Sequence, residues 1–393
     1  MTKLDLRVFS NYTSLAMLNI HAIDVAMRKL GLNGTTLAEA CGVSKEATSN
    51  WLKGESIPRP SKLALLSEVL DIPVDSLLEI VSPPQPLYAY RTKLNKPVTG
   101  ALRESAEEQA RHLEQLIPYI DGGCEFDPPL LRTPSLDSEH IRSVTIQVRQ
   151  SLGLSTKDIL SNEALERLFH IFGAKFVPVL WGLNKERHEN ALTIYSPESK
   201  VSWVVFNLGC KEDDYKYWLA HEYGHCLTMH ALNEEEGETF AEKFAQQLVF
   251  PDEVAHECLE ILRQSPATGI RGVKEFADRY GISVITVLRA VDRLSEQLYG
   301  KKTGLDTPSF YAVWNANRKD VNSMAKNHFG SDSPSQHDYV AKSEAIYKTE
   351  VFKAIEEFQK NEGGRNPAFI SSALNIGIGD ALNLSHALWE RQP

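Results

Sequence analysis

Two histidines and a glutamate in one short motif are the residues of this 393-residue chain that point most directly to chemistry. His221 and His225 are four positions apart in the run HEYGH, so on a helix both imidazoles project from one face, about 6 Å apart along the axis. Such a pair can share a tetrahedral metal ion, and we expect Zn2+. Glu222 is placed to take a proton from an activated water instead of binding the metal. The motif therefore predicts the site of a zinc hydrolase.

A zinc ion in such a site needs a third protein ligand, and no further histidine follows at a suitable spacing. Glu238 is the predicted third ligand, on a second helix that runs from 238 to 249 and packs against the first through small alanines. Glu242, one turn further on, is predicted to accept the second ring proton of a ligand histidine. Three rival acids lie in a run that we expect to be a solvated loop, namely Glu234, Glu235 and Glu236.

The elements that must position these residues are a small sheet and a helix start. Three apolar runs predict strands over 175–181, 191–195 and 201–206, and the last leads into the motif helix, which Asp213 or Asp214 can cap. A strand that feeds such a helix is typical of metallopeptidases, where the strand edge holds an extended peptide over the metal. Four side chains remain open as donors to the developing oxyanion: Tyr195, Tyr223, His188 and Tyr280.

The order strand, HExxH, loop, then Glu-x-x-Ala-x-x-Phe-Ala-x-x-Leu-x-x-Pro resembles the ImmA/IrrE-type metallopeptidases over about residues 140 to 295. The matching positions of the last run are Glu238, Ala241, Phe244, Ala245, Leu248 and Pro251. That family usually has Asn or Asp where this chain has Glu242. The resemblance implies a gluzincin-like endopeptidase in which His221, His225 and Glu238 hold zinc and Glu222 is the general base. It also implies a small number of regulatory protein substrates, often DNA-bound repressors with helix-turn-helix folds.

A second pattern, over residues 18 to 80, resembles the lambda-repressor-like (XRE) helix-turn-helix domains. The run TLAEA at 36–40 is followed by a turn at Gly42, and Ser44 then opens a helix that is expected to end at Gly54. We predict DNA contacts from this helix by Ser44, Lys45, Thr48, Asn50 and Lys53, with Arg59 and Lys62 as further phosphate contacts. Residues 1 to 82 carry eight basic and nine acidic side chains, so the positive surface available to DNA is confined to this helix and the loop that follows it.

Composition excludes some classes of function and frames the rest. With 42% hydrophobic and 24% charged residues, the chain is long enough for two or three domains, and its net charge of -10 argues against wholesale coating of nucleic acid. No run of eighteen apolar residues and no signal-peptide pattern occur, so we expect no membrane partner and a cytoplasmic location. Five scattered cysteines without a CxxC pair suit reduced thiols.

The predicted fold class is α+β and multidomain. We expect an all-α helix-turn-helix domain over 1–82, a linker and helix over 83–137, and a small-sheet HExxH metallopeptidase core over 138–298. A helical C-terminal region of unknown role follows over 299–393. The helix pair within 273–294, with its turn at Gly281, is expected to pack against the core and not to read DNA.

Two functional hypotheses follow. In the first, a zinc endopeptidase is brought by its helix-turn-helix domain to a DNA operator or a repressor substrate, as a homodimer, in stress, mobile-element or toxin-antitoxin control. In the second, the chain is a transcriptional regulator or antitoxin-like binding protein whose metal site is structural or sensory.

Overall fold

The computed structural model of the chain divides into two compact units, Met1–Gln85 and Pro86–Pro393. It describes residues 15–53, 56–81, 87–90, 100–120, 128–181, 191–265, 269–362 and 364–391. Gly54, residues 82–86 where the expected linker begins, Cys124 and the candidate donor His188 lie outside these ranges. The second unit combines segments that the sequence assigns to a linker, a peptidase core and a C-terminal region.

The first unit is a helical domain closed by one small sheet. Its elements are β1 (Leu15–Leu18), α1 (Ile20–Leu30), α2 (Gly34–Ala40), α3 (Lys45–Leu52), α4 (Pro60–Leu70), α5 (Val74–Leu77) and β2 (Leu78–Val81). The expectation of an all-α domain is wrong in one respect, because β1 and β2 pair antiparallel, with Leu15 opposite Val81. Each strand has four residues, and their partners are some sixty positions apart, so no local pattern reveals the pairing.

The second unit is built on a four-stranded sheet in the order β3-β5-β6-β4. Strand β5 pairs antiparallel with both β3 and β6, whereas β4 pairs parallel with β6. Every residue of β5 and β6 is buried, as expected of strands covered on both faces. The strand bounds are β3 (Leu87–Tyr90), β4 (Lys175–Val179), β5 (Ala191–Ser196) and β6 (Val201–Asn207). The sequence predicts the last three and misses β3.

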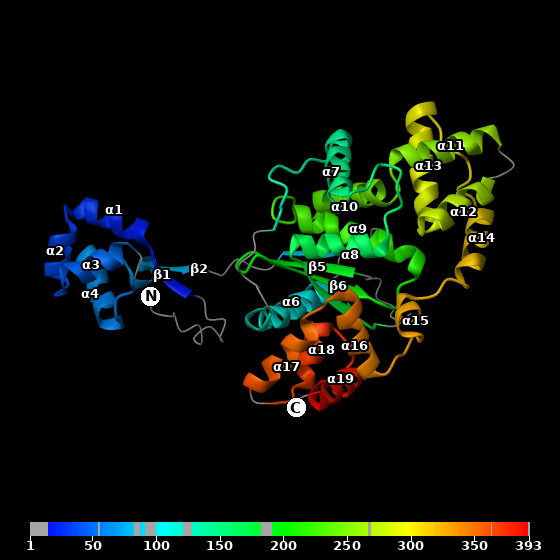
Figure 1. Cartoon of the computed structure of the whole chain (residues 1–393). Coiled ribbons are helices and arrows are strands. Elements are labelled where there is room, and N and C mark those ends of the chain that lie inside the picture. Colours follow the sequence, from blue (N-terminus) through cyan, green and yellow to red (C-terminus); the bar gives the residue numbers. More distant parts are fainter. Residues whose placement is uncertain are drawn as a thin grey trace. The chain divides into compact units, whose positions relative to one another are not determined.

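Helices cover both faces of this sheet, with α7–α10 on one side and α6 and α16–α19 on the other (Figure 1). Their bounds are α6 (Gly100–Glu114), the 3-10 turn η2 (Ile117–Tyr119), α7 (Ser138–Ser151), α8 (Asn162–Phe172), α9 (Glu212–Thr228), α10 (Glu234–Val249), α11 (Asp252–Gln264), α12 (Gly269–Tyr280), α13 (Val284–Tyr299), α14 (Pro308–Arg318), α15 (Met324–Phe329), α16 (Gln336–Tyr347), α17 (Val351–Asn361), α18 (Pro367–Leu374) and α19 (Ile378–Glu390).

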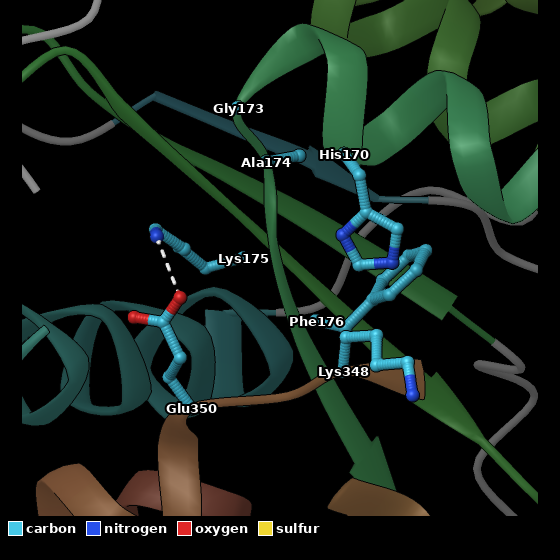
Figure 2. Close-up of a pocket in the computed structure, with 7 residues that line it drawn as sticks. All are labelled: His170, Gly173, Ala174, Lys175, Phe176, Lys348 and Glu350. Atoms are coloured by element: carbon cyan, nitrogen blue, oxygen red, sulfur yellow. Dashed lines mark hydrogen bonds and ion pairs between the residues drawn. The ribbon is translucent and has the colours of Figure 1, made fainter. Parts of the chain in front are cut away.

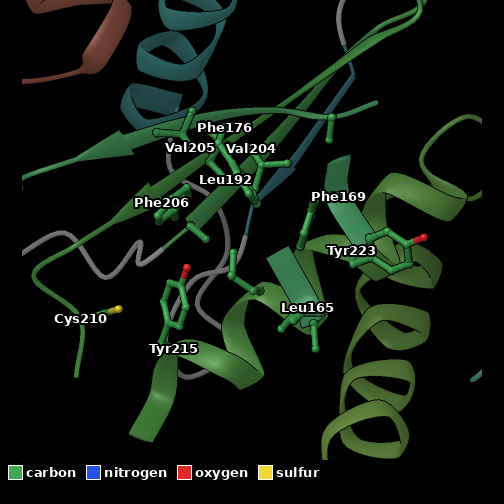
Figure 3. Close-up of a cluster of buried hydrophobic side chains, with 14 of the residues drawn as sticks. Leu165, Phe169, Phe176, Leu192, Val204, Val205, Phe206, Cys210, Tyr215 and Tyr223 are labelled. Carbon is green, nitrogen blue, oxygen red and sulfur yellow. The ribbon is translucent and has the colours of Figure 1, made fainter. Parts of the chain in front are cut away.

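Helix α9 carries the HEYGH motif through the centre of the core. Thirteen of its seventeen residues are buried, so it is enclosed on all sides instead of showing one solvent face. Its N-cap is Lys211, and Asp213 and Asp214 lie in the first turn, where acids favour the helix dipole, and do not cap it. Phe169 and Tyr223 meet edge to face within the aromatic cluster between α8, α9 and the sheet (Figure 3).

The C-terminal helices complete the sheet. The Tyr339 hydroxyl donates to the Pro178 carbonyl at 2.6 Å, and the Thr349 hydroxyl donates to the Phe176 carbonyl at 2.6 Å, so both satisfy backbone groups of β4. The Trp181 indole donates to the Leu374 carbonyl at 3.0 Å. Residues 299–393 are therefore part of the second unit's core, a role that their sequence does not reveal.

Candidate metal centre and nucleic-acid interface

The two motif histidines and Glu238 converge in the second unit. The Nε2 atoms of His221 and His225 are 2.9 Å apart. The Glu238 carboxylate lies 3.4 Å from the His221 Nε2 and 3.1 Å from the His225 Nε2. Both histidines are buried, while the Glu238 side chain is 27% exposed. Helices α9 and α10 thus bring together the three residues that the sequence selects as metal ligands.

The chemistry of this donor set fits a zinc ion. Tetrahedral ligands about 2.0–2.1 Å from zinc stand roughly 3.3 Å from one another, which is close to the observed separations. Two imidazole nitrogens and one carboxylate, with access from the Glu238 side, match the three-ligand pattern of sites that keep one position open. His221, His225 and Glu238 could therefore hold the ion without rearrangement of either helix.

The histidine pair also controls the charge of Glu238. Burial raises the pKa of this carboxyl, but hydrogen bonds and charge from His221 and His225 outweigh burial and hold the pKa well below its usual range. Glu238 is therefore an anion, the form that binds a cation.

Glu222 is held by a residue that the sequence did not single out. The Thr193 hydroxyl of β5 donates to the Glu222 Oε2 at 2.7 Å, and both residues are buried. A hydrogen bond to the carboxylate fixes its orientation. The only signal in the sequence is a polar residue between Leu192 and Ile194, which does not identify its partner.

The remaining predicted residues of this site have different surroundings. Glu242 follows Glu238 on α10 and is exposed, and its role beside a ligand histidine stays a prediction. The acidic run is not a loop, because Asn233 caps α10 and the three acids form its first turn. Tyr223 is buried among aromatic rings, and the Tyr280 hydroxyl donates to the Lys157 carbonyl at 3.0 Å. Tyr195 lies two residues from Thr193 on β5 and therefore on the same face of the sheet.

A separate hollow lies at the start of β4 (Figure 2). It is lined by His170, Lys175 and Lys348, and Lys175 is paired with Glu350 at 3.1 Å. Burial lowers the pKa of His170, and the charge of Lys175 lowers it further, so this imidazole is neutral. The hollow shares no residue with the histidine pair.

In the first unit, α2 and α3 form a helix-turn-helix. Gly42 adopts a φ of 59° in the turn, a left-handed conformation that favours glycine. The Ser44 hydroxyl caps α3 by accepting from the Ala47 amide at 3.1 Å. Ser44, Lys45 and Lys53 are exposed and Asn50 is half-buried, so these four remain candidates for DNA contact.

Two expected DNA contacts need correction. Thr48 is fully buried, and its hydroxyl points back to the Ser44 carbonyl at 3.5 Å, so it belongs to the packing face of α3. The error comes from the helix phase, because the burial of Trp51 three positions later places Thr48 on the same side. The Lys62 ammonium donates to the Cys41 carbonyl at 2.8 Å and stabilises the turn, so it is not an outward phosphate contact.

Comparison with known families agrees with this geometry in the first unit. Residues 26–77 match the helix-turn-helix family model. These residues form a domain of the DNA-binding helix-turn-helix class, and the match indicates a DNA-binding regulator. No curated protein gives a match to the chain.

Within the described ranges, every helix is too short or too polar to span a bilayer. The homodimer, the repressor partner and the DNA operator stay predictions.

Proposed function

We propose that the second unit is a zinc-dependent endopeptidase, coupled in one chain to the DNA-binding domain. The observation that carries this proposal is the convergence of His221, His225 and Glu238 within hydrogen-bond distances of one another. Glu222 lies on the same helix as the two histidines, and the Thr193 hydroxyl of β5 holds its carboxylate. An inert structural pair of histidines needs neither a third anionic donor nor an oriented buried carboxylate.

Zinc, when bound, would supply a Lewis acid that polarises a peptide carbonyl and acidifies water. The chain's own residues then have distinct tasks. His221, His225 and Glu238 hold the ion, and Glu222 takes the proton of the attacking water and passes it to the leaving amine. Thr193 fixes the orientation of Glu222. Tyr195 lies on the sheet face that Thr193 uses, which favours it among the candidate oxyanion donors.

The first unit supports a proposal for the substrate class. A helix-turn-helix domain in the same chain brings the peptidase to DNA or to a DNA-bound protein, so we propose that it cleaves a regulatory protein such as a helix-turn-helix repressor. Such an enzyme would act on few substrates in transcriptional control.

The test uses three Glu→Gln variants of the full chain. Purified protein is incubated with helix-turn-helix repressors encoded beside it, with zinc or with chelator, and the products are measured by intact mass spectrometry. Glu222→Gln should keep one zinc per chain and lose cleavage, while Glu238→Gln should lose zinc and cleavage together. Glu235→Gln changes an exposed acid in the first turn of α10 and should change neither.

A second candidate function rests on the helix-turn-helix match alone. In that case the chain is a DNA-binding regulator or antitoxin-like protein whose metal site is structural or sensory. Glu222→Gln would then leave zinc content and DNA binding as they are in the parent protein, and no repressor would be cut by either protein.

A further inference from the structure

The edge of the sheet nearest the candidate site is occupied by the chain's own strand β3. Leu87–Tyr90 pairs antiparallel with β5, with Leu87 opposite Tyr195 and Tyr90 opposite Leu192. The other edge of β5 is filled by β6, so β3 closes the one remaining edge of β5 that a further strand could use.

This edge runs along the candidate site. Strand β5 packs on α9, and its Thr193 binds the Glu222 carboxylate. The backbone of Ala89 lies directly opposite Thr193, and β3 also contacts α10, the helix that carries Glu238. The segment Leu87–Tyr90 therefore contacts α10 directly and pairs with the strand that packs on α9.

Peptides are commonly bound by addition of an extended strand to a sheet edge, through backbone hydrogen bonds that any sequence can make. A protein segment presented to Glu222 in this way would pair with β5 where β3 now pairs. The two cannot share one edge, because each backbone donor and acceptor of β5 serves a single neighbour on that side.

The construction of β3 suits an occupant that can leave. The strand has four residues, few enough that only a few backbone hydrogen bonds hold it, and the Leu87 side chain is 38% exposed. The opposite edge of the sheet differs, because two buried hydroxyl groups donate to the carbonyls of β4, that of Tyr339 on α16 and that of Thr349 between α16 and α17.

We propose that Leu87–Tyr90 is an intramolecular competitor for the substrate. It occupies the edge of β5 that the substrate's extended segment needs, and the second unit is latent while β3 is in place. This inference rests on the function proposed above.

The test compares two probes on the zinc-loaded full-length protein by calorimetry. Acetohydroxamate is small and binds the metal alone, whereas an extended peptidyl hydroxamate also needs the β5 edge. In the variant Tyr88→Pro/Ala89→Pro, both residues lose their backbone N–H. Alternate residues of an antiparallel strand donate to the neighbouring strand, so one of these two N–H groups donates to β5, and the variant removes that hydrogen bond. The matched control is Tyr88→Val/Ala89→Val, which keeps both amides and favours a strand.

The peptidyl compound should bind the proline variant at least about tenfold more tightly than the parent or the valine control. The reason is that a larger fraction of the variant molecules has the edge of β5 free for the compound. Acetohydroxamate should bind all three proteins equally. Equal affinity of the peptidyl compound for all three would overturn the proposal while the zinc site stands. Absence of zinc or of acetohydroxamate binding in the parent protein would instead remove the proposed function, and this inference with it.

A measurement on the parent protein covers the case in which the proline variant does not fold. Hydrogen exchange is followed with and without saturating peptidyl hydroxamate. The amides of Leu87–Tyr90 should lose protection when the compound binds, while those of β5 stay protected. Continued protection of Leu87–Tyr90 in the bound protein would overturn the proposal.

Discussion

Gly224 of α9 lies directly against Ala241 of α10. A Cβ atom built at position 224 would stand 2.9 Å from the Ala241 Cα, which is closer than packed atoms approach, and 3.3 Å from the Phe244 ring, which is a tight contact. The glycine inside the HEYGH motif therefore sets the distance between the two helices, and with it the distance from Glu238 to the histidine pair.

Gly224→Ala should force α10 away from α9. We expect a loss of stability of about 1–3 kcal/mol from overpacking and weaker zinc binding, because Glu238 moves with its helix. Gly237→Ala is the matched control, since its Cβ would meet only the His225 Nδ1, at an ordinary 3.9 Å. Urea unfolding and zinc titration check both variants, and equal zinc affinity in the two would show that Gly224 does not set the position of Glu238.

Thr193→Val removes the hydroxyl that binds Glu222 and keeps the shape of the side chain. A hydrogen bond to a charged group contributes about 1.5–3 kcal/mol, so kcat should fall by about 10- to 100-fold with KM and zinc content little changed. Thr193→Ser restores a hydroxyl and should recover most of the rate. A variant in which KM rises and kcat is unchanged would show that Thr193 does not position Glu222.

Glu166 gives a pH dependence that can be measured apart from activity. Burial raises its pKa from 4.5 to about 7, although the Tyr215 hydroxyl donates to it at 2.8 Å. The folded protein therefore holds this proton more tightly than the unfolded chain. Its contribution to stability is present below about pH 4.5 and is lost as pH rises through 7.

Glu166→Gln should abolish this contribution. Relative to the parent, the variant should gain up to about 3 kcal/mol in free energy of unfolding between pH 4.5 and 8. Urea unfolding at both ends of this range measures the difference. For Glu163→Gln, the free energy of unfolding relative to the parent should change in the opposite direction and fall as pH rises. The reason is that a backbone hydrogen bond and one from Ser161 lower the pKa of Glu163. A constant difference between Glu166→Gln and the parent across this range would refute the raised pKa of Glu166.

Lys45→Gln tests the DNA-binding helix. Loss of one phosphate contact should weaken binding to all DNA sequences and reduce the slope of log affinity against log salt by about one. Thr48→Val is the control, because Thr48 is buried and should leave that slope unchanged. If Thr48→Val alters the slope as much as Lys45→Gln, Thr48 does not belong to the packing face of α3.

Much of the fold was predictable where its signals are local. The motif helix, the helix of Glu238 and the strands β4, β5 and β6 follow from periodicity, and the four-residue spacing brings His221 and His225 together on one face. The residues that escaped prediction depend on contacts between distant segments. Thr193 acquires its role only when β5 packs on α9, and β3 is four residues long with its partner about a hundred positions away.

The hydroxyl contacts of Tyr339 and Thr349 with β4 limit how the protein can be divided for study. A fragment that ends at residue 298, where sequence patterns alone would end the catalytic region, lacks both hydroxyl donors. The outer edge of strand β4 would then be exposed to water. Exposed edge strands of different molecules pair with one another through backbone hydrogen bonds, so such a fragment should precipitate or form filaments on purification. The last hundred residues thus protect the sheet from self-association, in addition to filling its core.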